Sequence, residues 1–352
     1  MSDYHLTRDD YFPSPPDDKG YGIGIIGTGG IVRGTHLPAY RNCGYRVLAC
    51  CDIVEDNARQ AAEAFNIPVY SNKMEDVLNH PEVAIIDLAV HATQRLAVIE
   101  QIARAPRKPR AILSQKPFAM NYADAARMVE LCYEAGIVLM INQQARWAPA
   151  HRALKHVIDS GQLGHVYSVT HLLRAFQDHP GSWYVALENF NIVDHGIHYI
   201  DLSRYFTGRT PERVKATTVM VPGQAAVSPM IYSILCEYEK SANIMATLHF
   251  NNIVQVPGTM SRHEWFVDGT LGSASISNTE LVVSFKDSPQ SKRVFQIQGS
   301  WFPDAFGGSM GELMRALNEN REPTTSGRDN LNSIKIAYAA VESSETGHTI
   351  SL

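Results

Sequence analysis

The chain has 352 residues, of which 45% are hydrophobic and 19% charged, and its formal net charge is −5. This length predicts two domains, and the composition is that of an ordinary globular enzyme. The acidic balance gives no electrostatic reason to bind nucleic acid, and no apolar run is long enough to cross a bilayer. The N-terminus does not resemble a secretory signal, and the five cysteines are odd in number without CxxC spacing. We therefore expect a reduced, cytoplasmic protein.

Residues 1–20 are polar and carry Pro13, Pro15 and Pro16 close together. Such a segment can form neither a core strand nor a stable helix, which predicts an arm or a disordered leader. The rest of the chain divides by pattern into a first domain at 21–145 and a second at 146–352.

The first domain shows apolar runs that alternate with segments of helical spacing. The expected strands are 21–26, 46–51, 83–90, 111–114 and 137–141, and the expected helices between them include 56–65, 94–103 and 122–135. This alternation predicts a parallel sheet with helical crossovers. In such a sheet, ligands bind beyond the carboxyl ends of the strands.

A glycine-rich turn follows the first expected strand. Gly27 suits a sharp turn, Gly29 permits close approach to a pyrophosphate, and the next helix would point its amides at that anion. An ordinary glycine turn is the alternative, because Val32 occupies the third glycine position. The predicted phosphate-binding residues are Gly27, Thr28, Gly29, Gly30 and Ile31.

Asp52 closes the second expected strand and suits the diol of an adenosine ribose. A carboxylate repels a 2′-phosphate, and neither Ile53 nor Val54 supplies a cation, so we expect NAD rather than NADP. Arg33 in the turn is the residue that could still reach a phosphate. Val90, His91, Gln115 and Lys116 follow the third and fourth strands at the same edge, and we expect them to complete the cofactor site.

The second half of the chain predicts a largely antiparallel sheet. Strand-like alternation occurs at 166–173, 214–221, 230–238, 243–250 and 263–267, with helices at 150–160, 191–206, 308–320 and 330–344. The overall fold class is α/β.

Two sets of residues could perform chemistry. Lys116 sits between a strand and Pro117, which disfavours a helical conformation before it; a solvated lysine is the alternative. Asp194, His198, Asp201 and Tyr205 follow helical spacing, so an acid and an imidazole one turn apart could share a proton. A satisfied helix histidine is the alternative there. Asp194, His195 and His198 are metal-ligand types without an established ligand spacing, so we expect no metal.

The sequence resembles the Gfo/Idh/MocA family along nearly its whole length. The resemblance rests on the glycine turn followed by residues 36–40, on Gln115-Lys116-Pro117 where the family shows Glu-Lys-Pro, and on Asp194, Gly196, His198 and Asp201 in the second domain. Residues 269–272, 310–325 and 339–347 look like the family's closing strand and helices.

The resemblance implies an N-terminal Rossmann domain at 21–145 and an α/β domain at 146–352 that binds substrate and forms a homo-oligomer, dimer or tetramer, through its open sheet. It implies hydride transfer between NAD and a sugar, inositol or polyol. By position, Lys116 corresponds to the lysine that contacts substrate and nicotinamide, His198 to the catalytic histidine, and Asp194 to its acidic partner.

Two departures from the family pattern concern the cofactor side. Val90-His91-Ala92 and Arg95 replace a Thr-Pro-Asn segment with a later histidine, and Gln115 replaces glutamate. The loss of that negative charge would make Lys116 easier to deprotonate.

Trp183, Tyr184, His179 and Asp201 are the substrate candidates, since they mix aromatic faces with hydrogen-bonding groups. Two other functions stay open. One is an NAD-retaining enzyme that oxidises a sugar transiently and eliminates a substituent; the other is a cofactor-sensing regulatory protein without catalysis.

Overall fold

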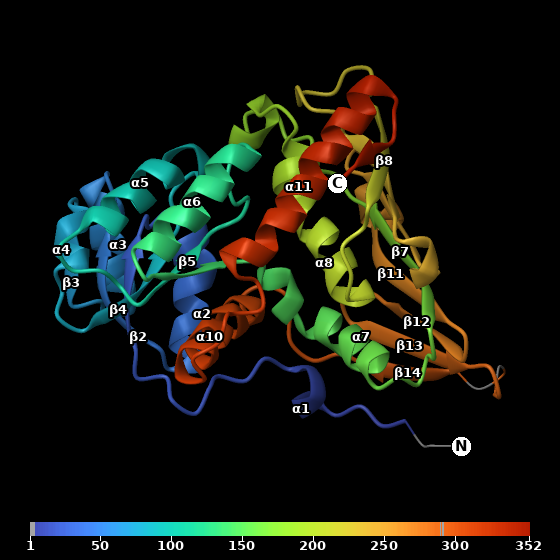
Figure 1. Cartoon of the computed structure of the whole chain (residues 1–352), viewed down its shortest axis with the longest axis horizontal. Coiled ribbons are helices and arrows are strands. Elements are labelled where there is room, and N and C mark those ends of the chain that lie inside the picture. Colours follow the sequence, from blue (N-terminus) through green and yellow to red (C-terminus); the bar gives the residue numbers. More distant parts are fainter. Residues whose placement is uncertain (1–3, 289, 291) are drawn as a thin grey trace. The chain divides into compact units, whose positions relative to one another are not determined.

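A computed structural model describes residues 4–288, 290 and 292–352. The chain forms two compact units (Figure 1). Unit 1 comprises Met1–Phe12, Pro149–Ser300 and Asn332–Leu352, and unit 2 comprises Pro13–Ala148 and Trp301–Leu331. Each unit has its own sheet.

Unit 2 contains a six-stranded parallel sheet in the order β3-β2-β1-β4-β5-β6. Its strands are β1 (Gly22–Ile26), β2 (Arg46–Cys51), β3 (Val69–Ser71), β4 (Val83–Leu88), β5 (Ala111–Ser114) and β6 (Val138–Ile141). Its helices are η1 (Val32–His36), α2 (Leu37–Cys43), α3 (Glu55–Phe65), α4 (Met74–Leu78), α5 (Ala92–Arg104), α6 (Tyr122–Glu134), η2 (Gln144–Trp147) and α10 (Asp304–Asn318). The five predicted strands are confirmed, and the short β3 was missed because three residues carry no readable alternation.

Unit 1 is built on a nine-stranded sheet in the order β14-β13-β12-β11-β7-β10-β9-β8-β15. Only the β7–β10 pair is parallel among these strands. The strands are β7 (Val166–Arg174), β8 (Arg213–Val219), β9 (Ile231–Glu237), β10 (Met245–Asn251), β11 (Arg262–Gly269), β12 (Gly272–Ile276), β13 (Glu280–Phe285), β14 (Arg293–Gln296) and β15 (Ile350–Ser351). The predicted fold class, a parallel sheet followed by a largely antiparallel one, is confirmed.

The helical segments of unit 1 lie mainly on one side of this sheet. Figure 1 shows α7 (Pro149–Asp159), α8 (Ile197–Thr207) and most of α11 (Gly327–Thr346) on that side. The short segments are α1 (Arg8–Tyr11), η3 (Trp183–Ala186), η4 (Phe190–His195), η5 (Lys240–Ala242) and α9 (Pro257–Met260). Burial alternates along β7, β9 and β10, because every second side chain turns away from the helices. The outward face of the sheet is therefore open within unit 1.

The chain does not divide where the sequence predicted. Residues Trp301–Leu331 fold with unit 2, although the sequence predicted them inside the second domain, 146–352. The reason is α10, whose Phe306, Met310 and Leu313 are buried in the same core as strand β1 and helix α2. The amino-acid composition does not show that the chain returns to unit 2 at residue 301, because α10 is an amphipathic helix like its neighbours.

Residues 4–20, within the segment expected as an arm or a disordered leader, pack against the folded units. Tyr4 is 5% exposed, and its ring lies edge-on to Phe295 with centroids 5.8 Å apart. Arg152 Nε donates to the carbonyl of Tyr11 over 2.7 Å within unit 1. In unit 2, Asn318 Nδ2 donates to the carbonyl of Asp18 over 3.0 Å. The aromatic side chains, hidden among polar residues in the sequence, anchor the arm.

His171 on β7 lies in the core of unit 1. Its ring is fully buried and stacks on Tyr199, with centroids 4.3 Å apart, and it also contacts Trp265 at 4.5 Å. Burial, and then the neighbouring histidines, hold the pKa of His171 well below its ordinary value of 6.5. Burial lowers the pKa of His263 in the same way. Both rings therefore stay neutral in the folded unit.

This burial predicts a loss of stability in mild acid. Below about pH 6.5 the histidines bind protons in the unfolded chain, whereas the rings of His171 and His263 stay neutral in the folded unit. The free energy of unfolding therefore falls as the pH falls. Thermal unfolding measured between pH 8 and pH 5 should show this decline, and His171→Phe should flatten it. His165→Phe, at an exposed position of the same unit, is the control that should keep the wild-type slope. Equal slopes in wild type and His171→Phe would contradict the prediction.

Candidate active site

The glycine turn after β1 has the geometry that a dinucleotide needs. Gly27 has φ +92°, and a Cβ there would lie 2.9 Å from the carbonyl oxygen of Ala89, so only glycine fits. A Cβ at Gly29 or Gly30 would meet nothing within 4 Å, so this part of the turn borders open space. Val32, at the third glycine position, is fully buried in the core of unit 2. The turn thus leaves room for close backbone approach by a phosphate.

Asp52 ties the end of β2 to this turn. Its Oδ2 accepts the backbone N–H of Thr28 over 2.8 Å, and its Oδ1 accepts that of Val54 over 3.0 Å. Ile53 is 95% exposed beside it, and the side chain of Arg33 donates to Gln60 on α3. A carboxylate with an apolar neighbour therefore stands next to the glycine turn.

Arg95 joins the loops that follow β4 and β5. Its side chain is only 2% exposed, and its guanidinium donates to the carbonyls of Val90, Gln115, Pro117 and Phe118. The contact to Val90 spans 2.9 Å and that to Phe118 spans 3.2 Å. One buried cation thus binds both loops that carry the predicted cofactor residues.

In the sequence analysis Arg95 is only a departure from a family pattern, and its role in binding the two loops was not predicted. The available signal is periodicity: Ala92, Arg95, Ile99 and Ile102 form the buried face of α5. A charge on a core stripe needs strong partners, and backbone carbonyls at the strand ends supply them here. His91 caps the same helix, with its Nδ1 accepting the N–H of Thr93.

Lys116 lies two residues beyond the end of β5 and is partly buried. The Lys116–Pro117 peptide is cis. The preceding Gln115 is 7% exposed, and its Nε2 lies 3.1 Å from His36 Nε2. His36 Nδ1 in turn lies 2.6 Å from Asp87 Oδ2. A buried polar chain therefore reaches from β4 to the residue that precedes the lysine.

In unit 1 the predicted helix over 191–206 is interrupted. Residues Phe190–His195 form the π-helical segment η4, and α8 begins at Ile197. The N–H of Gly196 donates to the carbonyl of Asn191 over 2.7 Å, a five-residue step. A π turn holds about one residue more than an α turn, so the helix that the sequence predicted over 191–206 is not continuous in its α geometry. Asp194 lies in the wide turn and His198 in the first turn of α8.

Asn191 anchors this turn from inside the unit. Its Nδ2 donates to the carbonyl of Pro229 over 2.7 Å, and its Oδ1 accepts from Asn252 Nδ2 over 3.0 Å. The hydroxyl of Tyr232 donates to the Asn191 carbonyl over 2.7 Å. A Cβ at Gly196 would lie 2.7 Å from that same carbonyl oxygen and 2.8 Å from the Tyr232 hydroxyl. The turn therefore depends on glycine at 196, which the sequence did not reveal.

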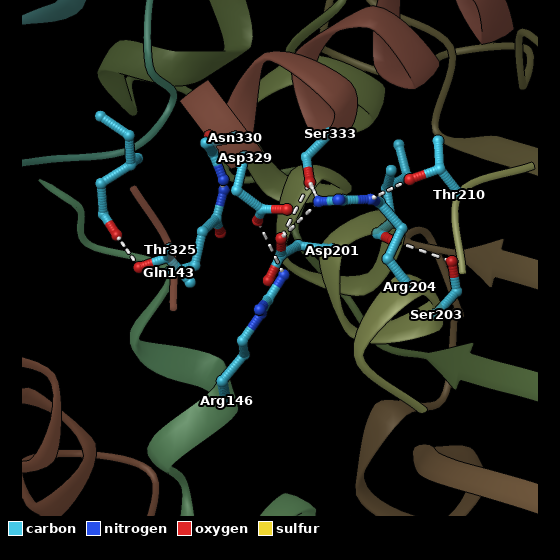
Figure 2. A network of polar contacts seen from close by, with 12 residues as sticks. Gln143, Arg146, Asp201, Ser203, Arg204, Thr210, Thr325, Asp329, Asn330 and Ser333 are labelled. Carbon is cyan, nitrogen blue, oxygen red and sulfur yellow. Dashed lines mark hydrogen bonds and ion pairs between the residues drawn. The ribbon is translucent and has the colours of Figure 1, made fainter. Parts of the chain in front are cut away.

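Asp201, a predicted substrate residue, is fully buried between α8 and α11 (Figure 2). Its Oδ1 accepts from Ser333 Oγ over 2.8 Å and lies 3.7 Å from Arg204 Nη1. Arg204 also donates to Ser333 Oγ over 2.9 Å and to Thr210 Oγ1 over 3.2 Å. These contacts give Asp201 a role in joining two helices of unit 1, and we leave it out of the proposed substrate contacts.

Figure 2 also shows a polar group that belongs to unit 2 and follows β6. Arg146 Nη2 lies 3.5 Å from Asp329 Oδ2, and Gln143 Nε2 lies 3.4 Å from Asn330 Oδ1. Thr325 Oγ1 donates to the carbonyl of Ile141 over 2.7 Å. The segment Trp301–Leu331 is thus bound to the carboxyl end of β6.

Trp183 and Tyr184 extend an aromatic group toward η4. Trp183 is 61% exposed, whereas the ring of Tyr184 stacks on Phe190 with centroids 4.6 Å apart and an interplanar angle of 16°. Phe190 is in turn stacked toward His195 at 6.4 Å. His179 lies before η3, with its ring edge-on to Phe176 at 5.2 Å. The aromatic candidates therefore border the segment that carries Asp194.

The structure brings the predicted residues into two sets, one in each unit. The glycine turn, Asp52, Gln115 and Lys116 belong to unit 2, and Asp194 and His198 belong to unit 1. Convergence of Lys116 with His198 stays a prediction. In the part of the chain that the structure describes, no group of three or more His, Cys, Asp or Glu side chains could hold a metal ion. No helix among those residues is long and apolar enough to span a bilayer.

The strand order of unit 2, the glycine turn and the acid after β2 together define a dinucleotide-binding Rossmann domain. Residues 21–143 match the family model "Oxidoreductase family, NAD-binding Rossmann fold", and residues 151–275 match the "GFO/IDH/MocA C-terminal domain". The chain belongs to the Gfo/Idh/MocA oxidoreductase family, as the motifs predicted, and NAD is the cofactor of its first domain.

Curated relatives extend the match over most of the chain. A D-apiose dehydrogenase of Paraburkholderia graminis is 28% identical over 342 residues, covering 93% of this chain and 88% of the relative. A myo-inositol 2-dehydrogenase of Thermotoga maritima is 22% identical, covering 94% of this chain and 98% of the relative. The chain is thus an oxidoreductase of the sugar and polyol dehydrogenase type.

Solved structures share the fold. An oxidoreductase from Agrobacterium radiobacter, crystallised with NAD+, L-tartaric acid and magnesium, superposes with a TM-score of 0.83 at 22% identity. The match covers 94% of this chain and 98% of that one. A levoglucosan dehydrogenase in complex with NADH and levoglucosan gives a TM-score of 0.79 at 17% identity, covering 94% and 99%.

The crowding at Gly196 yields a prediction. Gly196→Ala should push the Asn191 carbonyl and the Tyr232 hydroxyl apart and move Asp194 relative to α8. Displacement of a reacting group by about 1 Å can cost on the order of 100-fold in rate, so kcat should fall by roughly 10- to 100-fold. NADH binding should stay within about twofold, because the nucleotide turn lies in the other unit.

Gly258→Ala is the matched control, since a Cβ at that helical position of unit 1 meets nothing within 4 Å. Steady-state kinetics and NADH fluorescence titration measure the two effects. Wild-type kcat in Gly196→Ala would show that the turn does not position the reacting groups.

Proposed function

We propose that the chain transfers a hydride between the nicotinamide of NAD and a hydroxyl-bearing carbon of a sugar, an inositol or a related polyol. The observation that carries the proposal is the placement of Lys116. It stands beyond the carboxyl end of β5, at the ligand edge of an NAD-binding sheet, and Arg95 fixes its loop to the loop after β4. The relatives named as D-apiose and myo-inositol dehydrogenases support the substrate class.

In this proposal a substrate hydroxyl binds among Lys116, Asp194 and His198. His198 acts as the base that takes the hydroxyl proton. Lys116 orients the hydroxyl oxygen and stabilises the negative charge that develops on it. Asp194 holds the imidazole in the orientation that accepts the proton. The bound NAD supplies the hydride acceptor.

Trp183, Tyr184 and His179 are the side chains that we propose for substrate recognition. Trp183 offers an exposed indole face, and the ring of Tyr184 is fixed by its stack on Phe190. Flat aromatic faces of this kind suit the C–H faces of a sugar or polyol, and the polar edges suit its hydroxyls. Val90 and His91 are proposed for the nicotinamide side of the cofactor, because their loop after β4 is one of the two that Arg95 binds.

The two other functions are not favoured by the comparisons, which lead to named dehydrogenases.

We further propose a cytoplasmic homo-oligomer that forms through the open face of the nine-stranded sheet. That face presents Leu172, Leu235 and Phe266 on adjacent or nearby strands, with Phe266 38% exposed. Light scattering of the purified chain tests the assembly, since a single-chain mass would exclude it.

The reaction is tested by incubating the chain with NAD and a panel of aldoses, inositols and other polyols while following reduced nicotinamide at its absorbance band. With the substrate so found, His198→Ala should lower kcat by about 100- to 10,000-fold, the range of general acid–base catalysis. The affinity for NADH should not change. Equal loss of turnover and NADH binding would contradict the role of His198 as the base.

Asp52 predicts the choice of cofactor. Its carboxylate would face a 2′-phosphate beside Ile53 and Val54, which are 95% and 53% exposed and carry no charge, while the side chain of Arg33 donates to Gln60. Like charges in contact cost several kcal/mol, so NADPH should bind roughly tenfold or more weaker than NADH. Fluorescence titration with both cofactors measures this ratio, and Asp52→Asn should reduce it. Tighter binding of NADPH to the wild type would overturn the preference.

A further inference from the structure

Gln115, His36, Asp87 and Tyr40 form a buried chain of polar side chains in unit 2. All four are less than 9% exposed, and His36, Asp87 and Tyr40 are fully buried. Asp87 Oδ2 receives the hydroxyl of Tyr40 over 2.8 Å and lies 2.6 Å from His36 Nδ1. The other ring nitrogen of His36 lies 3.1 Å from Gln115 Nε2. The chain ends one residue before Lys116.

Few other groups face His36 among the described residues. Helix α10 presents the uncharged ring of Phe306, with centroids 4.7 Å apart. Helix α2 presents Tyr40, whose pKa is raised well above its ordinary value by burial and then by Asp87, so its hydroxyl stays a donor. Strand β4 presents Asp87, and the cation Arg95 binds the carbonyl of Gln115. The two ring nitrogens of His36 thus face one carboxylate and one carboxamide.

A carboxamide at position 115 can satisfy His36 in either protonation state. When the ring is neutral and donates from Nδ1 to Asp87, Gln115 can donate to the Nε2 lone pair through its own N–H groups. When the ring is protonated, the same side chain can turn and accept from Nε2–H through its oxygen. The contact to the residue before Lys116 therefore survives a change of charge on His36.

A carboxylate in the same place could not do this, because it can only accept. With glutamate at 115, a neutral His36 would face one of its two carboxylates with a lone pair, whichever tautomer it adopts. Only the imidazolium could donate to both Asp87 and residue 115. Glutamine and glutamate have nearly the same shape, so the difference between them at this position is one of hydrogen-bonding capacity and charge.

We propose that Gln115 is a positioning residue that holds Lys116 in place whether or not His36 carries a proton. It does so by keeping the buried chain from Asp87 connected to the loop after β5 in both states. The inference rests on the role of Lys116 in the proposed function. Arg95 holds the backbone of the same loop, and Gln115 adds a side-chain contact to His36.

The test compares the full-length wild type with Gln115→Glu across pH 5 to 10. With glutamate at 115, only the protonated ring of His36 can donate to both carboxylates, so the contact should be present at low pH and lost as the pH rises. In this variant, kcat/KM should fall by about tenfold per pH unit above one new ionisation, and the thermal unfolding temperature relative to wild type should fall in the same window. Wild type should lack both features.

Gln115→Met is the second variant, since it keeps the length of the side chain and removes its hydrogen bonds. It should lower kcat/KM by roughly tenfold at every pH without a new ionisation, so the inference stays testable should the glutamate variant fail to fold. The double variant His36→Leu with Gln115→Glu should lose the new ionisation, which assigns it to His36. Wild-type activity in Gln115→Met, or a wild-type pH profile in Gln115→Glu, would overturn the inference.

The unfolding measurements separate this inference from the proposed function. They need no substrate, so a pH-dependent stability difference in Gln115→Glu reports the contact with His36 even if no sugar or polyol is oxidised. Absence of turnover in the wild type with the whole panel would count against the proposed function alone. A stability difference together with unchanged turnover would overturn the positioning of Lys116 by Gln115.

Discussion

The buried guanidinium of Arg95 is the interaction on which the ligand edge of unit 2 depends. Parallel strands bring their carboxyl ends to one edge, but the loops beyond those ends have no ladder to hold them. Arg95 donates to carbonyls from the loops after both β4 and β5, and so turns two loops into one rigid border. The backbone on both sides of Lys116 is therefore bound, at the carbonyls of Gln115 and Pro117.

The corresponding element in unit 1 is a backbone turn. A regular α-helix through residues 191–206 would leave Asn191 and Gly196 out of register, whereas the π turn lets one carbonyl accept from Gly196 and from the Tyr232 hydroxyl. The turn is held by the buried side-chain amides of Asn191 and Asn252. Irregular helical turns of this kind occur often at functional sites, which agrees with the placement of Asp194 in it.

The sequence predicted most of the helices and strands. It predicted poorly the features that depend on contacts between residues distant in sequence. Strands β1, β2, β4, β5 and β6 follow from apolar runs between glycines and helical stretches, and the glycine turn follows from its spacing. The π turn could not be predicted, because it depends on Tyr232 and Asn252, which are distant in sequence. The role of Arg95 and the packing of α10 in unit 2 were not predicted for the same reason. Both depend on tertiary contacts, which the amino-acid composition does not record. For Asp201 the sequence predicted the helix correctly. It did not predict that the side chain is buried against Ser333.

The central claim is that Lys116 and His198 act on one hydroxyl group beside the nicotinamide. It is tested most directly by a crystal structure of the chain with NADH and the polyol or sugar identified as substrate. The account predicts that Lys116 Nζ and one ring nitrogen of His198 both lie within about 2.6–3.2 Å of the same substrate oxygen. Density that places the reactive carbon at the nicotinamide with His198 facing a different surface would contradict it.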